Sequence, residues 1–184
     1  MLNYEEIENI DIKEKFVSDF SYIFNKVKNE KKCIEVTFLC VGTDRITGDC
    51  FGPLVGSKLS KELKDCNYSN INVYGSLSQN LSYENINRVI QNIDKKSIII
   101  VIDAALSKEE NIGKIFVQKS KTILGKGLEK NKIEIGDISI KSVVAKDYKI
   151  AKCNFKALQN ISLNGVMRLA DIVSEGIFET IIKM

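Results

Sequence analysis

Residues 35–53 read EVTFLCVGTDRITGDCFGP, and this stretch decides the fold. A run of β-forming residues between 36 and 41 ends in a glycine, a polar loop follows, and an apolar helical pattern begins at Phe51. Strand, loop and helix in this order are typical of an α/β domain, in which ligands bind at the carboxyl ends of the strands. The loop carries two carboxylates, Asp44 and Asp49, between two glycines. We therefore expect this loop to lie at a functional edge of the sheet.

The composition is that of a single-domain globular protein. The chain has 184 residues, of which 44% are hydrophobic and 28% charged, as is typical of a soluble globular domain. No repeat or domain boundary is evident, so residues 1–184 are predicted to form one domain. The net charge of +3 is too small to indicate a nucleic-acid partner. The first residues lack an apolar signal core, and no apolar run approaches the ~18 residues that span a bilayer. We expect a cytoplasmic protein without a membrane partner.

The cysteines and the lack of histidine restrict the chemistry. Five cysteines, an odd number with no C-x-x-C spacing, predict reduced thiols that pack mostly as small hydrophobes. The chain contains no histidine. A Ser-His-Asp triad, a Cys-His dyad and a histidine-ligated zinc or nickel site are therefore excluded within this chain. Acid–base chemistry falls to carboxylates, lysines, tyrosines or cysteines.

Periodicity along the chain predicts alternating helices and strands. In chain order these are an accessory helix at 12–29, a strand at 34–41, a helix at 51–64, a strand at 71–74, a helix from 82, strands at 97–102, 113–118 and 137–144, and helices at 154–159 and 162–182. The strand at 97–102 (SIIIVI) is typical of a central strand buried on both faces, whereas 137–144 alternates like a half-exposed strand. Residues 119–136 are predicted to form a long lysine-rich loop, and loops of this length are usually functional or mobile.

A pair of carboxylates is the chemistry that this arrangement favours. Asp49 stands just before the helix that begins at Phe51, and Asp103 directly follows the strand at 97–102. In a parallel sheet both acids reach the same carboxyl edge. Two carboxyl groups held close cannot both ionise easily, so one stays protonated and the pair titrates as a unit. Such a pair offers a base that activates water and an acid that protonates a leaving amine.

Simpler interpretations of the same residues stay open. Asp49 is well placed to serve only as the N-cap of the helix, and Asp103 to serve only as a partner for a neighbouring turn. The two carboxylates also suit Mg²⁺ or Ca²⁺, which need no histidine. The loop matches neither the P-loop nor the G-x-G-x-x-G pattern, which argues against nucleotide binding. Cys50 lies near a helix N-terminus, which lowers a thiol pKa, but it has no histidine to activate it.

Several blocks of the sequence together resemble a known family. The blocks FLCVGTDRITGDCFGPLVGSKL, VYGSL, VIDAAL, GDISI and ALQNISLNGVMRLADIVSEGI, from about residue 37 to 177, resemble the YyaC-type sporulation proteins, which are labelled spore proteases. More remotely, the T-G-D-x-x-G-P and I-D-A segments are similar to those of the germination protease and of the hydrogenase-maturation endopeptidases. In the latter a histidine joins the equivalent acids in binding nickel. The absence of histidine here argues against nickel-guided processing.

The resemblance implies a fold, an activity and a site. It implies a three-layer α/β/α fold with a mostly parallel central sheet, in which Asp49 and Asp103 act in peptide hydrolysis. Asp44 is predicted to be a nearby auxiliary acid or a residue that shapes the loop. We therefore expect a sporulation-associated peptidase that acts on a protein or peptide, without a cofactor or metal, and with homo-oligomerisation left open. The alternatives are a catalytically silent binding or regulatory protein of sporulation, or a divalent-metal site at the same acids.

Overall fold

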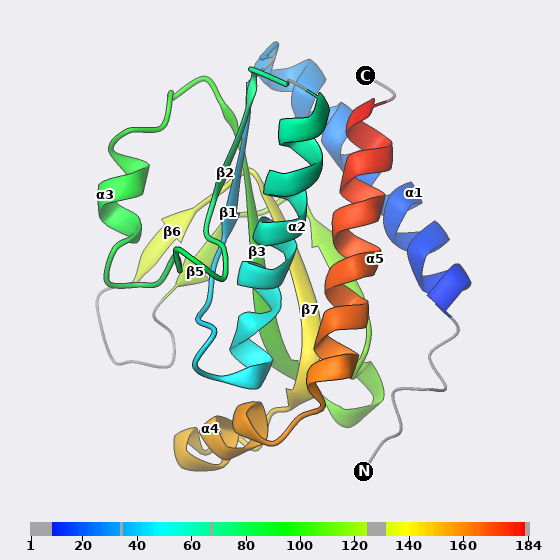
Figure 1. Cartoon of the computed structure of the whole chain (residues 1–184), viewed down its shortest axis with the longest axis vertical. Helices are drawn as coiled ribbons and strands as arrows, with labels where there is room; N and C mark the ends of the chain where they lie inside the picture. Colours follow the sequence, from blue (N-terminus) through cyan, green and yellow to red (C-terminus); the bar gives the residue numbers. More distant parts are fainter. Residues whose placement is uncertain (1–8, 34, 67, 125–131, 183–184) are drawn as a thin grey trace.

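The computed structural model describes residues 9–33, 35–66, 68–124 and 132–182, and a five-stranded sheet runs through its centre (Figure 1). The strands of this sheet are β1 (Val36–Cys40), β2 (Ile71–Tyr74), β3 (Ile98–Ser107), β4 (Ile115–Gln118) and β7 (Ile138–Lys146). They lie in the order β2-β1-β3-β7-β4. The first four are parallel and β4 is antiparallel to β7, which confirms the predicted, mostly parallel sheet.

Two outer layers cover the sheet. Three long helices, α1 (Asn9–Lys31), α2 (Phe51–Cys66) and α5 (Leu163–Ile182), lie together on one face (Figure 1). The other face packs against the short helix α3 (Ile86–Ile90) and a second sheet of two antiparallel strands, β5 (Thr122–Leu124) and β6 (Ile133–Ile135). The remaining elements are α4 (Ala151–Gln159) and two 3-10 turns, η2 (Thr47–Cys50) and η3 (Glu109–Asn111). The predicted three layers are present, but one outer layer is only partly helical.

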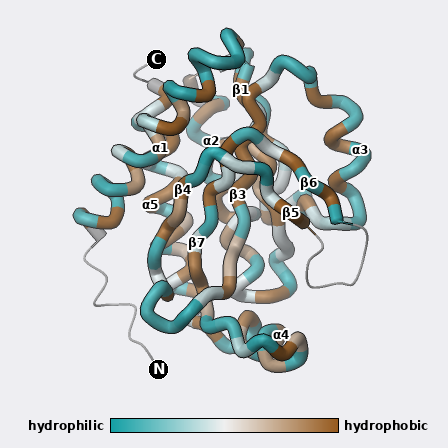
Figure 2. The backbone as a smooth tube through the Cα atoms, turned by 180° about the vertical axis from the view of Figure 1, so that it is seen from behind, coloured by the Kyte–Doolittle hydropathy of each residue, from teal (hydrophilic) through white to brown (hydrophobic). Residues whose placement is uncertain are grey.

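The N-terminal helix is part of the main core. Phe16, Phe20 and Phe24 recur every fourth residue of α1, and all three are buried against the sheet and α5. Neighbouring rings of this series lie 5.7 Å apart between centroids. Each fully buried side chain of this size contributes about 2–3 kcal/mol through the apolar surface it removes from water. The strands of the sheet are likewise rich in buried hydrophobic residues (Figure 2).

None of the described helices is long and apolar enough to cross a bilayer.

Three local predictions are wrong. Residues 119–136 are not a structureless loop, because β5 and β6 occupy part of them; residues 125–131 lie outside the described part of the chain. The strand at 138–146 is almost wholly buried and not half-exposed, because both of its faces are covered. Ile138 and Ile140 pack in the core with α1 and α5, and Ser139 bonds to Thr122 of β5. The strand that begins at Ile98 does not stop before Asp103 but continues to Ser107, paired with β7.

The junction between β1 and α2 allows no side chain at two positions. Gly42 has a φ of +139°, a conformation that L side chains rarely adopt, and a Cβ there would lie 2.0 Å from the carbonyl oxygen of Asp49. A Cβ on Gly52 would lie 2.1 Å from the carbonyl oxygen of Val41. The first turn of α2 therefore packs directly on the backbone at the end of β1.

Substitution of Gly52 tests this contact. Gly52→Ala is expected to lower the free energy of unfolding by about 1–3 kcal/mol, because the added methyl group forces α2 away from β1. Urea unfolding followed by circular dichroism measures the change. Lys61→Ala, on an exposed position of the same helix, is the matched control and is expected to stay within about 0.5 kcal/mol of the wild type. A Gly52→Ala variant as stable as the control would contradict the proposed close packing.

Candidate active site

Asp103 lies where β1 ends and its own strand continues. The backbone N–H of Val41 donates a hydrogen bond to the carbonyl oxygen of Ile102 at 2.8 Å, and β1 has no further ladder contact with β3 beyond this point. Asp103 is the next residue of β3 and still pairs with Lys141 of β7 on its other side. The acid therefore stands inside a strand, at the level where the neighbouring strand has stopped. The gap left by β1 opens the site.

Asp49 is held by the loop that precedes it and does not cap α2. It lies in the 3-10 turn η2, immediately before the helix. Its carboxylate oxygen Oδ2 accepts a hydrogen bond from the backbone N–H of Thr43 at 3.0 Å, and the same N–H lies 3.2 Å from the carbonyl oxygen of Asp49. The bond points back along the chain, away from the first turn of α2. The N-cap interpretation is therefore wrong, because Thr43 takes the place of the helix amides.

The third predicted acid, Asp44, lies outside the cleft. Its side chain is exposed, and its Oδ1 accepts a hydrogen bond of 2.6 Å from Nδ2 of Asn80. Asp44 thus ties the loop after β1 to the segment that follows β2. This position favours the loop-shaping role over the role of auxiliary acid.

Asp49 and Asp103 line one cleft of about 640 Å³. Its walls come from the loop after β1, from the segment between β2 and α3, and from β5. The residues of these walls are Val41, Gly42, Thr43, Arg45, Ile46, Asn80, Ser82, Tyr83, Glu84, Asn85, Ile123 and Leu124. The structure therefore brings together the two acids that come from distant parts of the sequence.

Sequence reasoning missed the wall formed by residues 80–85 and the wall formed by β5. The first follows a cluster of small polar residues, GSLSQN at 75–80, which is a recognisable signal for a turn at the carboxyl end of a strand. The second had no usable signal, because the three-residue strand β5 lies in a segment without a clear period.

Burial raises the pKa values of both acids, and like charge adds to the effect at Asp103. Burial in the cleft, followed by the negative charge of Asp49, raises the pKa of Asp103 from its usual 3.8 to about 7, and only Lys141 and a backbone amide oppose the change. By surface area the Asp103 residue is partly exposed, but its carboxyl group is the part packed among protein atoms. Burial also raises the pKa of Asp49, and the hydrogen bond from Thr43 opposes it. Asp49 therefore carries the first negative charge of the pair, and Asp103 keeps its proton until the pH approaches about 7.

The other groups in and near the cleft are less suited to chemistry. The Cys50 thiol is buried and donates to the carbonyl oxygen of Thr47 at 2.9 Å, and burial raises its pKa, so it is held as a thiol. Among the described residues no group of three or more cysteine, aspartate or glutamate side chains forms a metal-binding cluster. A Ca²⁺ ion takes six to eight oxygen ligands, so two carboxylates are a small part of such a site.

The chain belongs to the family described as "Protein of unknown function (DUF1256)", whose model matches residues 4–176. It is 33% identical over 145 residues to "Uncharacterized protein YyaC" of Bacillus subtilis (strain 168), a match that covers 77% of this chain and 67% of that protein. The predicted membership of the YyaC-type family is thereby confirmed.

Two solved structures are similar to this chain. The [NiFe] hydrogenase maturation protease HycI from Thermococcus kodakarensis KOD1 matches with a TM-score of 0.48 and 14% identity, over 78% of this chain and 92% of that one. The maturation protease HybD from Thermococcus kodakarensis matches with a TM-score of 0.37 and 15% identity, over 77% and 98%.

The titration of Asp103 tests the electrostatics of the site. We expect the carboxyl carbon of Asp103 to titrate near pH 7 in ¹³C NMR spectra of the wild type. In Asp49→Asn the pKa of Asp103 is expected to fall but to stay above 3.8, because the like charge is lost while burial remains. Asp44→Asn is the matched control and is expected to leave the Asp103 titration unchanged. An Asp103 pKa that is the same in all three proteins would show that the two carboxyl groups do not interact.

The raised pKa also predicts how stability depends on pH. Because the folded state holds the Asp103 proton more tightly than the unfolded chain, this group weakens the folded state progressively as the pH rises from about 4 to about 7. The shift from 3.8 to about 7 corresponds to at most about 4 kcal/mol. The free energy of unfolding of Asp103→Asn, measured with urea, is therefore expected to rise relative to the wild type across this range and then to level off. A difference that is constant with pH would contradict the burial of the carboxyl group.

Proposed function

We propose that this protein is a peptidase-like hydrolase in which Asp49 and Asp103 together activate a water molecule. The observation that carries the proposal is the presence of both acids in one cleft, with the pKa of Asp103 raised to about 7 in part by the charge of Asp49. When two neighbouring carboxyl groups differ in pKa, the one with the lower pKa can act as the base and the one with the higher pKa as the acid. The resemblance of the two sequence segments to those of the germination protease supports the same pair.

The protonation states suit hydrolysis of an amide bond. Ionised Asp49 accepts a proton from water while the oxygen of that water bonds to the peptide carbonyl carbon. Protonated Asp103 donates its proton to the leaving nitrogen as the carbon–nitrogen bond breaks. The proton on Asp49 then returns to Asp103 through water, which restores the pair. No histidine or thiolate is needed, in agreement with a chain that has no histidine and a cleft-side thiol that is held protonated.

The proposed substrate is a polypeptide and the proposed setting is sporulation. The cleft is open and carries both hydrogen-bonding side chains, from residues 80–85, and an apolar wall at Ile123 and Leu124. Both features suit a polypeptide, which presents amides and side chains at once. Sporulation is the setting that the family resemblance implies, and a cytoplasmic location is the one that the sequence favours. A binding or regulatory protein that uses the same cleft without catalysis is the competing function.

The paired acids are tested by substitution. We expect purified wild-type protein to cleave members of a peptide library or proteins of a sporulating-cell extract, read by mass spectrometry of the new termini. Asp49→Asn and Asp103→Asn are each expected to reduce cleavage by about 10²–10⁴-fold, because each removes one proton-transfer step. Asp44→Asn is the matched control and is expected to retain activity, since its side chain lies outside the cleft. Activity should decline above about pH 7, where Asp103 loses its proton.

Two outcomes would contradict the proposal. Cleavage that survives both substitutions would show that the acids are not catalytic. Binding of peptides by the wild type without any cleavage at pH 5–7 would favour the silent binding protein. Circular dichroism of each variant distinguishes loss of chemistry from loss of fold.

A further inference from the structure

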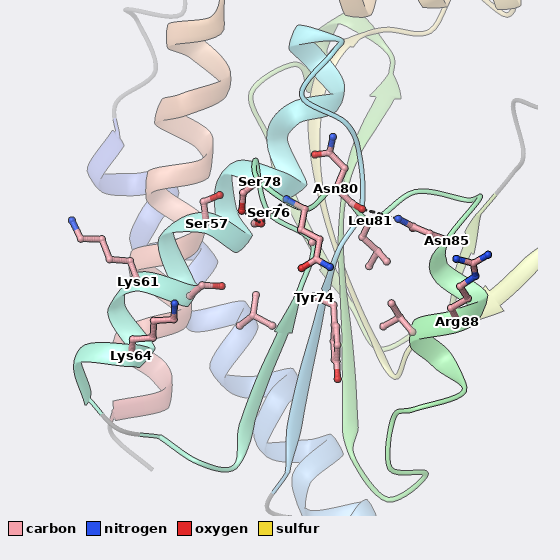
Figure 3. Close-up of a pocket in the computed structure, with 15 residues that line it drawn as sticks. Ser57, Lys61, Lys64, Tyr74, Ser76, Ser78, Asn80, Leu81, Asn85 and Arg88 are labelled. Atoms are coloured by element: carbon pink, nitrogen blue, oxygen red, sulfur yellow. Dashed lines mark hydrogen bonds between the residues drawn. The ribbon is translucent and has the colours of Figure 1, made fainter.

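A groove runs beside the aspartate cleft, along the edge of the central sheet. It consists of two cavities, of about 720 and 350 Å³, which share Ser60, Lys64 and Val73. Figure 3 shows the larger of the two. The larger cavity also shares Asn80 and Asn85 with the cleft that holds the two acids. We call the two cavities together the β2 groove, because β2 forms its floor. The β2 groove and the cleft thus make one continuous path over the surface.

The floor of the β2 groove is an open strand edge. Among the described strands, β2 pairs only with β1. The backbone N–H of Val36 donates to the carbonyl oxygen of Asn70 at 3.0 Å, and Val36 is in register with Ile71. In a parallel ladder the backbone groups of successive residues point alternately toward and away from the neighbouring strand. The N–H and C=O of Asn72 therefore face β1, and those of Val73 face away from it. The outward backbone groups of Val73 therefore point into the groove.

The walls of the β2 groove are basic. Lys61 and Lys64 come from α2 and Arg88 comes from α3, and Lys64 and Arg88 lie on opposite sides of Tyr74 of β2 (Figure 3). Among the residues that the structure describes, no aspartate or glutamate lines either cavity. Within the described residues these three cations form no ion pair, whereas eight other lysines each lie within 4 Å of a carboxylate. The groove therefore holds positive charge that the fold itself does not neutralise.

The serines of the groove argue against a small phosphate-like ligand. Ser57 Oγ accepts a hydrogen bond from the backbone N–H of Leu77 at 2.9 Å. Ser76 Oγ bonds to Ser78 Oγ at 3.0 Å and accepts from the N–H of Gln79 at 3.1 Å. These three hydroxyls are thus engaged in holding the loop after β2 in shape. An anionic ligand that meets Lys64 on one side and Arg88 on the other must be extended.

We propose that the β2 groove binds an acidic segment of an extended polypeptide, which adds as a strand to the open edge of β2 and continues into the cleft of Asp49 and Asp103. Backbone hydrogen bonds to β2 would supply affinity, as in other cases of strand addition. Lys64 and Arg88 would select carboxylate side chains. The role of the segment as part of a substrate rests on the proposed function, whereas its binding does not.

Binding is measured separately from cleavage. The Asp49→Asn/Asp103→Asn variant, which removes both proposed catalytic groups, is mixed with fluorescent peptides of one extended sequence that carry three Glu, three Gln or three Lys at the same positions. Fluorescence anisotropy is expected to show about tenfold tighter binding of the Glu peptide than of the Gln peptide, and weakest binding of the Lys peptide. Added salt should reduce this preference, because the charges are exposed.

Charge variants locate the preference. Adding Lys64→Gln and Arg88→Gln is expected to make the Glu and Gln peptides bind equally. Lys95→Gln, at an exposed position before β3, is the matched control and is expected to retain the preference. Equal binding of Glu and Gln peptides by the parent variant, or a preference that survives loss of Lys64 and Arg88, would overturn the proposal. Displacement of the Glu peptide by inorganic phosphate, beyond the effect of chloride at equal ionic strength, would overturn it in favour of a small-anion site.

Amide exchange tests the strand addition directly. On binding of the Glu peptide, exchange of the Val73 amide is expected to slow at least about tenfold, because it gains a backbone partner. The Asn72 amide, which already donates to β1, is the internal reference and is expected to change little. An unchanged Val73 amide in the bound state would overturn strand addition. Acidic peptides that bind in this way but are never cleaved by the wild type would leave the groove in place and refute only the proposed function.

Discussion

The close contact between the first turn of α2 and the end of β1 is the constraint on which the site depends. Because Gly52 has no side chain, the helix backbone rests on the carbonyl of Val41, and the intervening loop must fold tightly. That loop closes on itself through the N–H of Thr43, which meets both the carbonyl and the carboxylate of Asp49. A larger residue at Gly52 would move Asp49 together with the helix. The geometry of the acid is thus fixed by packing that lies one turn away from it.

The position of the two acids conflicts with stability. A carboxyl group whose pKa is raised by burial destabilises the folded state once it ionises, and this holds for both Asp49 and Asp103. At Asp103 the negative charge of Asp49 adds to the effect. The cost of burying each negative charge is partly offset by nearby groups. The backbone N–H of Thr43 stabilises ionised Asp49, and Lys141 and a backbone amide stabilise ionised Asp103. A core built for stability alone would place apolar or neutral side chains at both positions. Local conflicts of this kind are expected where function and not folding selects the residue.

The sequence predicts the arrangement of the sheet better than the details of the site. The strand at 71–74 has the predicted bounds and the helix α2 has the predicted start at Phe51, because Gly, Pro and polar clusters mark these positions. The helix ends at Cys66, two residues beyond the predicted end. The extension of β3 past Asp103 could not be predicted, because it depends on pairing with β7, which is distant in sequence. The prediction that Asp49 caps α2 was wrong for a similar reason. Helix-end statistics cannot foresee that Thr43 folds back to reach the same carboxylate.

The segment after β2 joins the groove and the cleft into one surface. The side chain of Asn85 accepts from the N–H of Ser82 and donates to the carbonyl oxygen of Asn80, both at 2.8 Å. Asn80 in turn donates to Asp44 in the loop that carries Asp49. This chain of hydrogen bonds fixes the wall between the edge of β2 and the two acids. A polypeptide that added to β2 as proposed would therefore meet the cleft at a constant position. Asp44 then contributes to the site through the loop that it holds and not through its own charge. Asp44 therefore serves the cleft by positioning the loop, and not as a third carboxylate.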